Sequence, residues 1–119
     1  MKIEIVIEGK GKALAEIDDR NPNTAEEICK NLPQEGSAKI WQEEVYFEIP
    51  VNLMHENKSP TSAKGDISYW PVGNAFCIFY GKSQPYSDVN HIGEIIENLE
   101  IFKTIENGDK IILRILDEK

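Results

Sequence analysis

Residues 65–81 constrain the fold of this chain most, because they place two strand-forming runs on either side of one tight turn. Proline and glycine or asparagine occupy residues 71–74, where proline presets φ and the others accept the positive φ of a turn. The run that follows, 75–81, is almost wholly apolar, so this strand should be covered on both faces or close into a barrel. The pattern predicts a β-hairpin at the centre of a mainly β protein.

The predicted hairpin concentrates aromatic side chains beside its turn, and these are Tyr69, Trp70, Phe76, Phe79 and Tyr80. They can form the wall of a pocket, or they can pack in the core. Apolar strand positions are buried far more often than they bind ligands, which favours core packing for any single ring. Both interpretations stay open for the group as a whole.

Three segments resemble the cyclophilin-like family of small prokaryotic and archaeal proteins. The first is Gly-Asp-Ile-x-Tyr-Trp-Pro-x-Gly-x-Ala-x-Cys-Ile-Phe-x-Gly over residues 65–81, and the second is Trp-Gln-Glu-Glu-Val-Tyr-Phe over 41–47. Residues 91–99 are similar to a strand-then-helix passage of true cyclophilins. The resemblance covers nearly the whole chain and implies a mainly β fold, a closed cyclophilin-like β-barrel of about eight strands with two short flanking helices. It implies no particular activity.

Length and charge narrow the class of protein further. The 119 residues, of which 40% are hydrophobic, predict one domain over 1–119. A net charge of −8 argues against nucleic acid or an anionic membrane as a partner. No apolar run approaches the roughly 20 residues that span a membrane, and the alternating first residues lack the apolar core of a secretory signal. We therefore expect a cytoplasmic protein.

The two cysteines and two histidines are scattered along the chain. Cys29 falls on a predicted helix face and Cys77 in a buried strand, which favours two reduced packing cysteines over a disulfide. A zinc site built from these cysteines with His55 and His91 would lack the short paired spacing of known zinc motifs. We expect no metal and no cofactor.

Helices and barrel closure are predicted from local patterns. Thr24 and Glu27 fit a capping box, which predicts a helix that begins at Thr24 and ends before Pro33. Asn98 can cap a second short helix. Alternating isoleucines in the first strand, around 3–7, and alternating apolar residues in the last strand predict that these strands pair and close the barrel.

One strand is predicted over residues 39–51, and Glu43 interrupts its apolar face. A carboxylate at an inward-facing strand position is costly to bury unless it is paired or hydrated, so Glu43 marks either a functional site or a residue at the barrel rim or in a bulge. The polar connection 52–64 is long for a small domain, which is typical of a functional lid or of a mobile insertion.

The resemblance to true cyclophilins raises prolyl cis/trans isomerisation, rotation about a bond with a barrier of roughly 18–20 kcal/mol. In those enzymes an arginine on the strand after the first helix polarises the prolyl amide. The matching strand, 40–48, contains no arginine, and neither Arg20 nor Arg114 matches by position. The enzymes' pocket histidine aligns with Val89. His91 lies two residues later on the same strand face, where it could partly substitute.

The leading hypothesis is a binding module for a small molecule or a peptide, with ligand-binding residues Glu43, Glu44, Tyr46, Trp70, Phe76 and His91. The alternative is an enzyme, either a weak peptidyl-prolyl isomerase or an unrelated activity with Glu43 and His91 as an acid–base pair. A third possibility is a structural partner in a larger complex. An exposed aromatic patch would favour this third class, whereas a concave aromatic pocket would favour the first two.

Overall fold

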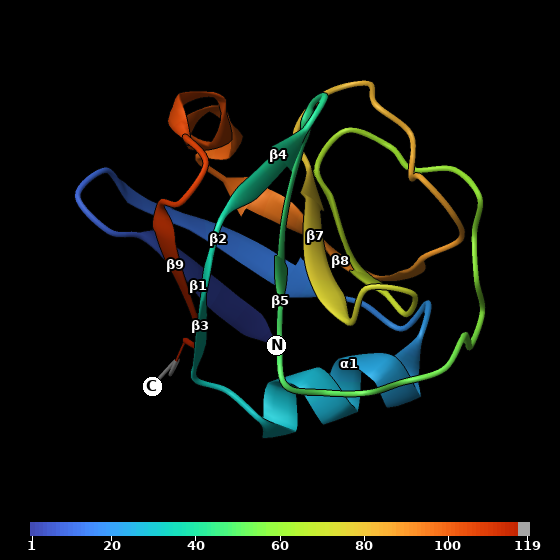
Figure 1. Ribbon diagram of the computed structural model, residues 1–119. Helices are drawn as coiled ribbons and strands as arrows, with labels where there is room; N and C mark the ends of the chain where they lie inside the picture. Colours follow the sequence, from blue (N-terminus) through green and yellow to red (C-terminus); the bar gives the residue numbers. More distant parts are fainter. Residues whose placement is uncertain (117–119) are drawn as a thin grey trace.

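A single curled sheet makes up most of the computed structural model, which describes residues 1–116 (Figure 1). Residues 117–119, which the single-domain prediction includes, lie outside the described residues. The described elements are β1 (Lys2–Ile7), β2 (Gly11–Ile17), α1 (Pro22–Lys30), β3 (Gln34–Ser37), β4 (Lys39–Trp41), β5 (Glu44–Glu48), β6 (Asp66–Trp70), β7 (Ala75–Phe79), β8 (Asn90–Glu97), the 3₁₀-helix η1 (Leu99–Thr104) and β9 (Lys110–Ile115).

The described strands form a nearly closed barrel, in the order β3-β9-β1-β2-β8-β6-β7-β5-β4. Every pair of neighbours is antiparallel. The last strand pairs with the first, from Ile3 opposite Ile115 to Ile7 opposite Ile111, which confirms the predicted pairing of these two strands. The predicted mainly β barrel fold is thus confirmed, with β3 and β4 as the two ends of the sheet.

The barrel interior is filled by β-branched and aromatic side chains that alternate along the strands. Fully buried members are Ile3, Ile5, Val45, Ile67, Tyr69, Phe76, Ile78, Ile111 and Leu113. The Tyr69 hydroxyl is satisfied inside this core, because it donates to Val51 O at 3.0 Å and accepts from Leu53 N at 3.1 Å. Tyr69 and its neighbour Trp70 therefore point to opposite faces of β6, as the alternation predicts.

The prediction of one strand over 39–51 is wrong, because the chain reverses at Gln42 and Glu43. These two residues join β4 to β5, Trp41 pairs with Glu44 across the hairpin, and Gln42 has a φ of 55°. Neither residue is one of the glycines, asparagines or prolines that usually mark a tight turn, so the sequence carries little sign of it. The reversal matters for the site, since it places Trp41 and Glu44 side by side.

The capping box at Thr24 is also wrong. Helix α1 begins at Pro22 after Asn21, in line with the preference of proline for the first helical position, so Thr24 lies within the first turn. Its hydroxyl donates instead to Glu56 Oε1 at 2.8 Å, which ties the helix to the 52–64 connection. Helix η1 follows Asn98 as predicted, although the Asn98 side chain makes no cap bond. Within residues 1–116 no helix is both long and apolar enough to cross a membrane.

Candidate ligand-binding site

The outer face of the sheet formed by β5, β7 and β6 carries the site. Side chains alternate along each strand, so those that do not enter the barrel point outward. Directly paired residues share a face, and the outward pairs include Tyr46 with Cys77 and Trp70 with Ala75. Residues of the connection between β7 and β8 lie over part of this face.

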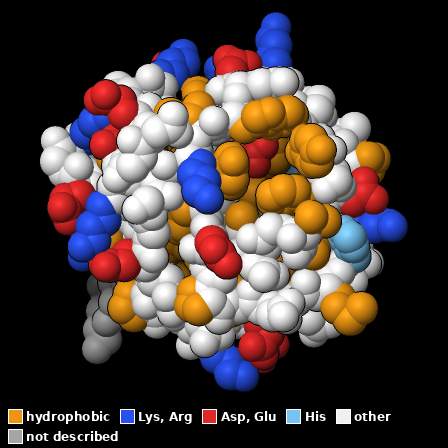
Figure 2. Space-filling model, in the orientation of Figure 1, with side chains coloured by type: hydrophobic (Ala, Val, Ile, Leu, Met, Phe, Trp, Pro, Cys, Tyr) orange, Lys and Arg blue, Asp and Glu red, His pale blue; other side chains and the backbone are white. Residues whose placement is uncertain are grey.

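A cavity of about 250 Å³ opens on this outer face. Figure 2 shows a hollow ringed by hydrophobic side chains, with acidic atoms visible inside it. The residues that line the cavity come from β4, β5, β6 and the β7–β8 connection, and they are Trp41, Glu44, Tyr46, Trp70, Pro85, Tyr86 and Val89. Six of the seven are apolar or aromatic, and the remaining one is a carboxylate.

The aromatic walls meet edge to face. Tyr86 lies between the two tryptophans, with ring centroids 5.9 Å from Trp41 and 6.1 Å from Trp70. Tyr46 continues the series at 6.4 Å from Trp70. The interplanar angles of 83°, 77° and 84° set neighbouring rings nearly at right angles, so the walls enclose a space instead of stacking into a layer.

Trp70 is held in place from two sides. Its indole N–H donates to Ser87 Oγ at 2.6 Å. A methyl group at Gly73 would lie 2.5 Å from Trp70 Cζ3, so only glycine leaves room for the ring to lie over the hairpin turn. The central hairpin and the β7–β8 connection together therefore fix the orientation of this wall.

Glu44 supplies the carboxylate of the cavity and is 6% exposed. Burial raises its pKa from 4.5 to about 7, and the Cys77 side chain, which hydrogen-bonds to the carboxylate, opposes that rise. Among the described residues Glu44 forms no ion pair. A carboxylate in an apolar surround with no cationic partner favours its neutral form, and such perturbed groups cluster at functional sites.

The cysteines lie apart as free thiols. Cys77 is fully buried on the outer face of β7, where burial and then the neighbouring Glu44 raise its pKa well above the ordinary value. Burial likewise raises the pKa of Cys29. Neither thiol has the depressed pKa of a reactive nucleophile. No cluster of three or more potential metal ligands occurs in the part of the chain that the structure describes.

The structure brings Glu44, Tyr46 and Trp70 together in the cavity but places the other three predicted ligand contacts elsewhere. Phe76 is fully buried inside the barrel, and its ring centroid lies 5.6 Å from the ring centroid of Phe47. The register of the hairpin explains this position, because Ala75 is the residue opposite Trp70 and Phe76 therefore points to the other face.

Glu43 lies in the β4–β5 turn at the rim of the sheet. Its carboxylate accepts the backbone N–H of Lys82 at 2.8 Å, and its own N–H donates to Ser83 Oγ at 2.7 Å. A methyl group at Gly81 would lie 2.3 Å from Glu43 Cδ, so the carboxylate packs directly against the backbone there. Glu43 thus fastens the turn to the start of the connection that carries Pro85 and Tyr86.

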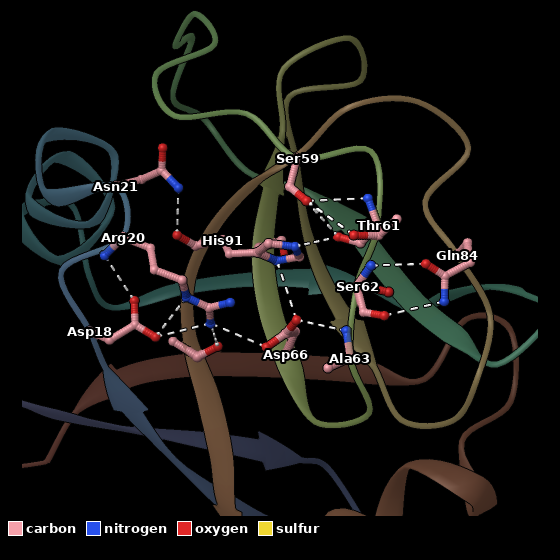
Figure 3. A network of polar contacts seen from close by, with 12 residues as sticks. Asp18, Arg20, Asn21, Ser59, Thr61, Ser62, Ala63, Asp66, Gln84 and His91 are labelled. Carbon is pink, nitrogen blue, oxygen red and sulfur yellow. Dashed lines mark hydrogen bonds and ion pairs between the residues drawn. The ribbon is translucent and has the colours of Figure 1, made fainter.

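His91 lies in a separate polar network (Figure 3). Its Nε2 donates to Thr61 O at 2.7 Å, and its Nδ1 lies 2.6 Å from Ser68 Oγ. Asp66 completes the network, because it accepts from Arg20 Nη2 at 3.1 Å and from Ala63 N at 2.8 Å, with its Oδ2 3.7 Å from His91 Nδ1. Both ring nitrogens of His91 are therefore used within the protein.

This network lacks the arrangement of a catalytic triad. Ser68 is fully buried, and both Ser68 and Asp66 approach the same nitrogen of His91, whereas a proton relay needs them on opposite nitrogens. Within residues 1–116 no hydrogen bond or ion pair joins Glu43 to His91. The geometry gives the predicted acid–base pair no direct contact.

Sequence reasoning missed four of the cavity residues, Trp41, Pro85, Tyr86 and Val89. Trp41 was missed because a single strand over 39–51, without the β4–β5 turn, does not bring Trp41 beside Glu44. The connection that holds Pro85 and Tyr86 has no periodicity from which a side-chain direction can be read. The one signal in the sequence was an aromatic residue, Tyr86, in an otherwise polar loop.

Comparisons with known proteins agree with the barrel. The sequence profile described as Cyclophilin-like matches residues 1–114, so the chain belongs to the cyclophilin-like family. The solution structure of the hypothetical protein AF2241 from Archaeoglobus fulgidus is similar, with 30% identity, a TM-score of 0.82, and coverage of 96% of this chain and 93% of that one. No curated protein gave a significant match.

A second solved structure, that of McbB in complex with tryptophan, has the same fold over part of its length. Its TM-score is 0.83 at 18% identity, and the match covers 98% of this chain but 45% of that one. The chain thus spans less than half the length of McbB.

Proposed function

We propose that this member of the cyclophilin-like family is a binding module that holds a small molecule, or a side chain of a peptide, in the aromatic cavity on the outer face of β5, β6 and β7. The observation that carries the proposal is a concave aromatic site with one buried carboxylate in its lining. Largely apolar pockets with a few placed polar groups are the usual form of ligand sites in proteins.

The size of the cavity limits what it can hold. Its volume of about 250 Å³ lies just below the roughly 300–1,000 Å³ typical of sites for drug-sized ligands. A small molecule or one or two peptide side chains fit this space. The McbB structure is compatible with this choice at the level of the fold, since a protein that contains this fold in 45% of its chain has been solved in complex with tryptophan, a small aromatic molecule.

We assign ligand contact to Glu44, Tyr46 and Trp70 among the residues predicted from the sequence, and we add Trp41 and Tyr86. In this proposal Glu43, Phe76 and His91 do not contact the ligand but support the segments around the cavity. Glu43 holds the β7–β8 connection, Phe76 packs the barrel beneath the sheet, and His91 anchors the 52–64 connection. We also propose a cytoplasmic location, because a reducing compartment keeps free thiols such as Cys29 and Cys77 reduced.

A ligand-observed and protein-observed NMR screen tests this function. We expect members of a mixed fragment library, neutral aromatics and amines included, to shift the indole N–H signals of Trp41 and Trp70 and the backbone signals of residues 85–89. Replacement of Tyr86 by alanine should weaken these hits, because the ring forms one wall and is exposed enough to be removed without unfolding. Met54→Ala, at a side chain that is 86% exposed and outside the cavity lining, is the matched control. If no fragment shifts these signals at millimolar concentration, the binding function is rejected.

A further inference from the structure

We propose that the cavity selects an organic cation, an ammonium group that carries apolar substituents, with Glu44 as its counter-ion and the aromatic rings as its walls. This inference rests on the proposed binding function and names the chemical class of the ligand.

The first argument is the missing partner of Glu44. An ionised carboxylate is costly to bury without a paired charge, yet no lysine or arginine of the described chain is among the residues that line the cavity. Asp66 is buried to a similar extent, with 7% of its surface exposed, and it forms an ion pair with Arg20. A cationic ligand would give Glu44 the positively charged partner that Arg20 gives to Asp66.

The second argument is the arrangement of the rings. A cation is attracted to the face of an aromatic ring within about 6 Å of its centroid, most strongly to tryptophan. The cavity has two tryptophans and two tyrosines, and adjacent rings stand at 77° to 84° to one another. Walls at nearly right angles let one compact cation meet more than one ring, which a flat stack would not allow.

The third argument is the balance between apolar and charged lining. A bare ammonium or metal ion would leave the aromatic walls without apolar contact, and a neutral hydrocarbon would leave the ionised form of Glu44 without a partner. A methylated or alkylated ammonium uses both features, because its substituents contact the rings while its charge is compensated by the carboxylate.

Binding should depend on pH through Glu44. The titratable groups that face it are the Cys77 thiol on β7 and the phenols of Tyr46 and Tyr86, and no cationic side chain of the described residues lines this space. Burial raises the pKa of Cys77 well above its ordinary value, so the thiol stays neutral. Since burial raises the pKa of Glu44 to about 7, a cation that needs the ionised form should bind more tightly as the pH rises through that value.

The test uses choline and 3,3-dimethylbutan-1-ol, which have nearly the same shape and differ in the charge at the central atom. Both are titrated into the full chain while the indole N–H signals of Trp41 and Trp70 are followed by NMR. We expect choline to bind at least about tenfold more tightly than the alcohol, a difference of about 1.4 kcal/mol that one cation–π contact and one charge pair can supply.

Two variants assign the effect to the carboxylate. Glu44→Gln keeps the shape of the side chain and should reduce choline affinity by about tenfold while it leaves the alcohol unchanged. Glu48→Gln removes a charge from an exposed position on the same strand, outside the cavity lining, and should change neither affinity. Choline affinity should also rise between about pH 6 and pH 8 in the wild type but not in Glu44→Gln.

The outcomes separate the ligand class from the binding function. Equal affinity for the two probes, or choline affinity that falls as the pH rises, overturns the cation proposal, and the second result would indicate a protonated Glu44 that donates to a neutral ligand. If neither probe binds while other fragments shift the cavity signals, the cation proposal fails and the binding function stands. If nothing shifts these signals, both are rejected.

Discussion

The outer face of the sheet carries two regions that bury a carboxylate in opposite ways. Around Asp66 each polar group has a partner, because Arg20, Ala63 N and the Ser68–His91 pair occupy the space around it. Around Glu44 the neighbours are aromatic rings and an open cavity. Both carboxylates are nearly buried, at 7% and 6% exposed, so burial alone does not distinguish them.

The two regions differ in the groups that compensate the buried carboxylate. A buried polar network whose members are all satisfied rigidifies the fold, and the Asp66 network joins β6, β8, the loop before α1 and the 52–64 connection. Among the described residues no cationic side chain compensates the charge of Glu44, and our proposal assigns that role to a ligand. Removal of each carboxylate should therefore change stability in opposite directions.

The largest effect is expected at Asp66. Replacement of Asp66 by alanine removes the acceptor of Ala63 N and one of the acceptors of the Arg20 guanidinium, and removal of one partner of a buried pair typically costs 3–5 kcal/mol. Because the Arg20 side chain is 41% exposed and keeps its ion pair with Asp18, we expect a loss of about 3 kcal/mol in urea unfolding. Asp19→Ala, an exposed carboxylate close by, is the control. Equal losses for the two variants would show that the network contributes no stability.

The opposite sign is expected at Glu44. Its pKa is raised from 4.5 in the unfolded chain to about 7 in the folded protein, so the wild type loses stability as the pH rises between these values. Glu44→Gln should not show this loss of stability, because glutamine does not ionise. It should match the wild type near pH 4 and exceed its free energy of unfolding by about 1–2 kcal/mol near pH 8, less than complete burial would give because the cavity is open to water.

Urea unfolding of both proteins across this pH range measures the difference directly. Glu48→Gln serves as the control for the loss of one negative charge, since Glu48 is exposed on the same strand. A destabilised Glu44→Gln variant at both ends of the pH range would mean that the ionised carboxylate has a stabilising partner, and the contrast with Asp66 would disappear.

A smaller effect is expected at Trp70. This ring is partly exposed at the cavity and rests on Gly73 and Tyr46, whereas a core aromatic is enclosed on every side. Trp70→Ala should cost about 1 kcal/mol in urea unfolding followed by far-UV circular dichroism, the typical loss for a point mutation. It should also weaken every ligand that binds in the cavity. A loss in the range of about 3–5 kcal/mol would make Trp70 a core residue and the central hairpin a folding motif.

The sequence alone predicted the elements that have a clear local pattern and missed those that do not. Strand β1 was predicted from its alternating isoleucines, and the hairpin of β6 and β7 was predicted from its apolar runs on either side of a proline- and glycine-containing turn. The β4–β5 turn was missed because Gln42 and Glu43 have no turn chemistry, and with it the position of Trp41 beside Glu44. A pattern of apolar residues shows which face of a strand a side chain occupies only where the ends of the strand and its pairing register are known.

The candidate site was predicted in part for the same reason. Glu44 and Tyr46 share one face of a strand, and Trp70 is the last strand residue before the hairpin turn, so local pattern pointed to these three residues of the cavity lining. Phe76 was placed with them although the pairing of Trp70 with Ala75 turns it inward. His91 and Tyr86 depend on long-range contacts with the 52–64 and β7–β8 connections, which no periodic pattern reveals.

The smallest effect, none at all, is expected for prolyl isomerisation, and the two regions give the reason. The resemblance to true cyclophilins implies an arginine that polarises the prolyl amide, but no described arginine lines the cavity. Arg20 is engaged in the other region by Asp18, Asp66 and Gly93 O, and Arg114 pairs with Glu4. A carboxylate occupies the cavity instead, and its negative charge would oppose the polarisation that an arginine provides.

We therefore expect no acceleration of Xaa-Pro exchange in a protease-free NMR assay with a short prolyl peptide. Clear exchange broadening at catalytic protein concentration, lost in Trp70→Ala, would show that the cavity performs this chemistry without an arginine, and the contrast between the two regions would then no longer separate structure from function.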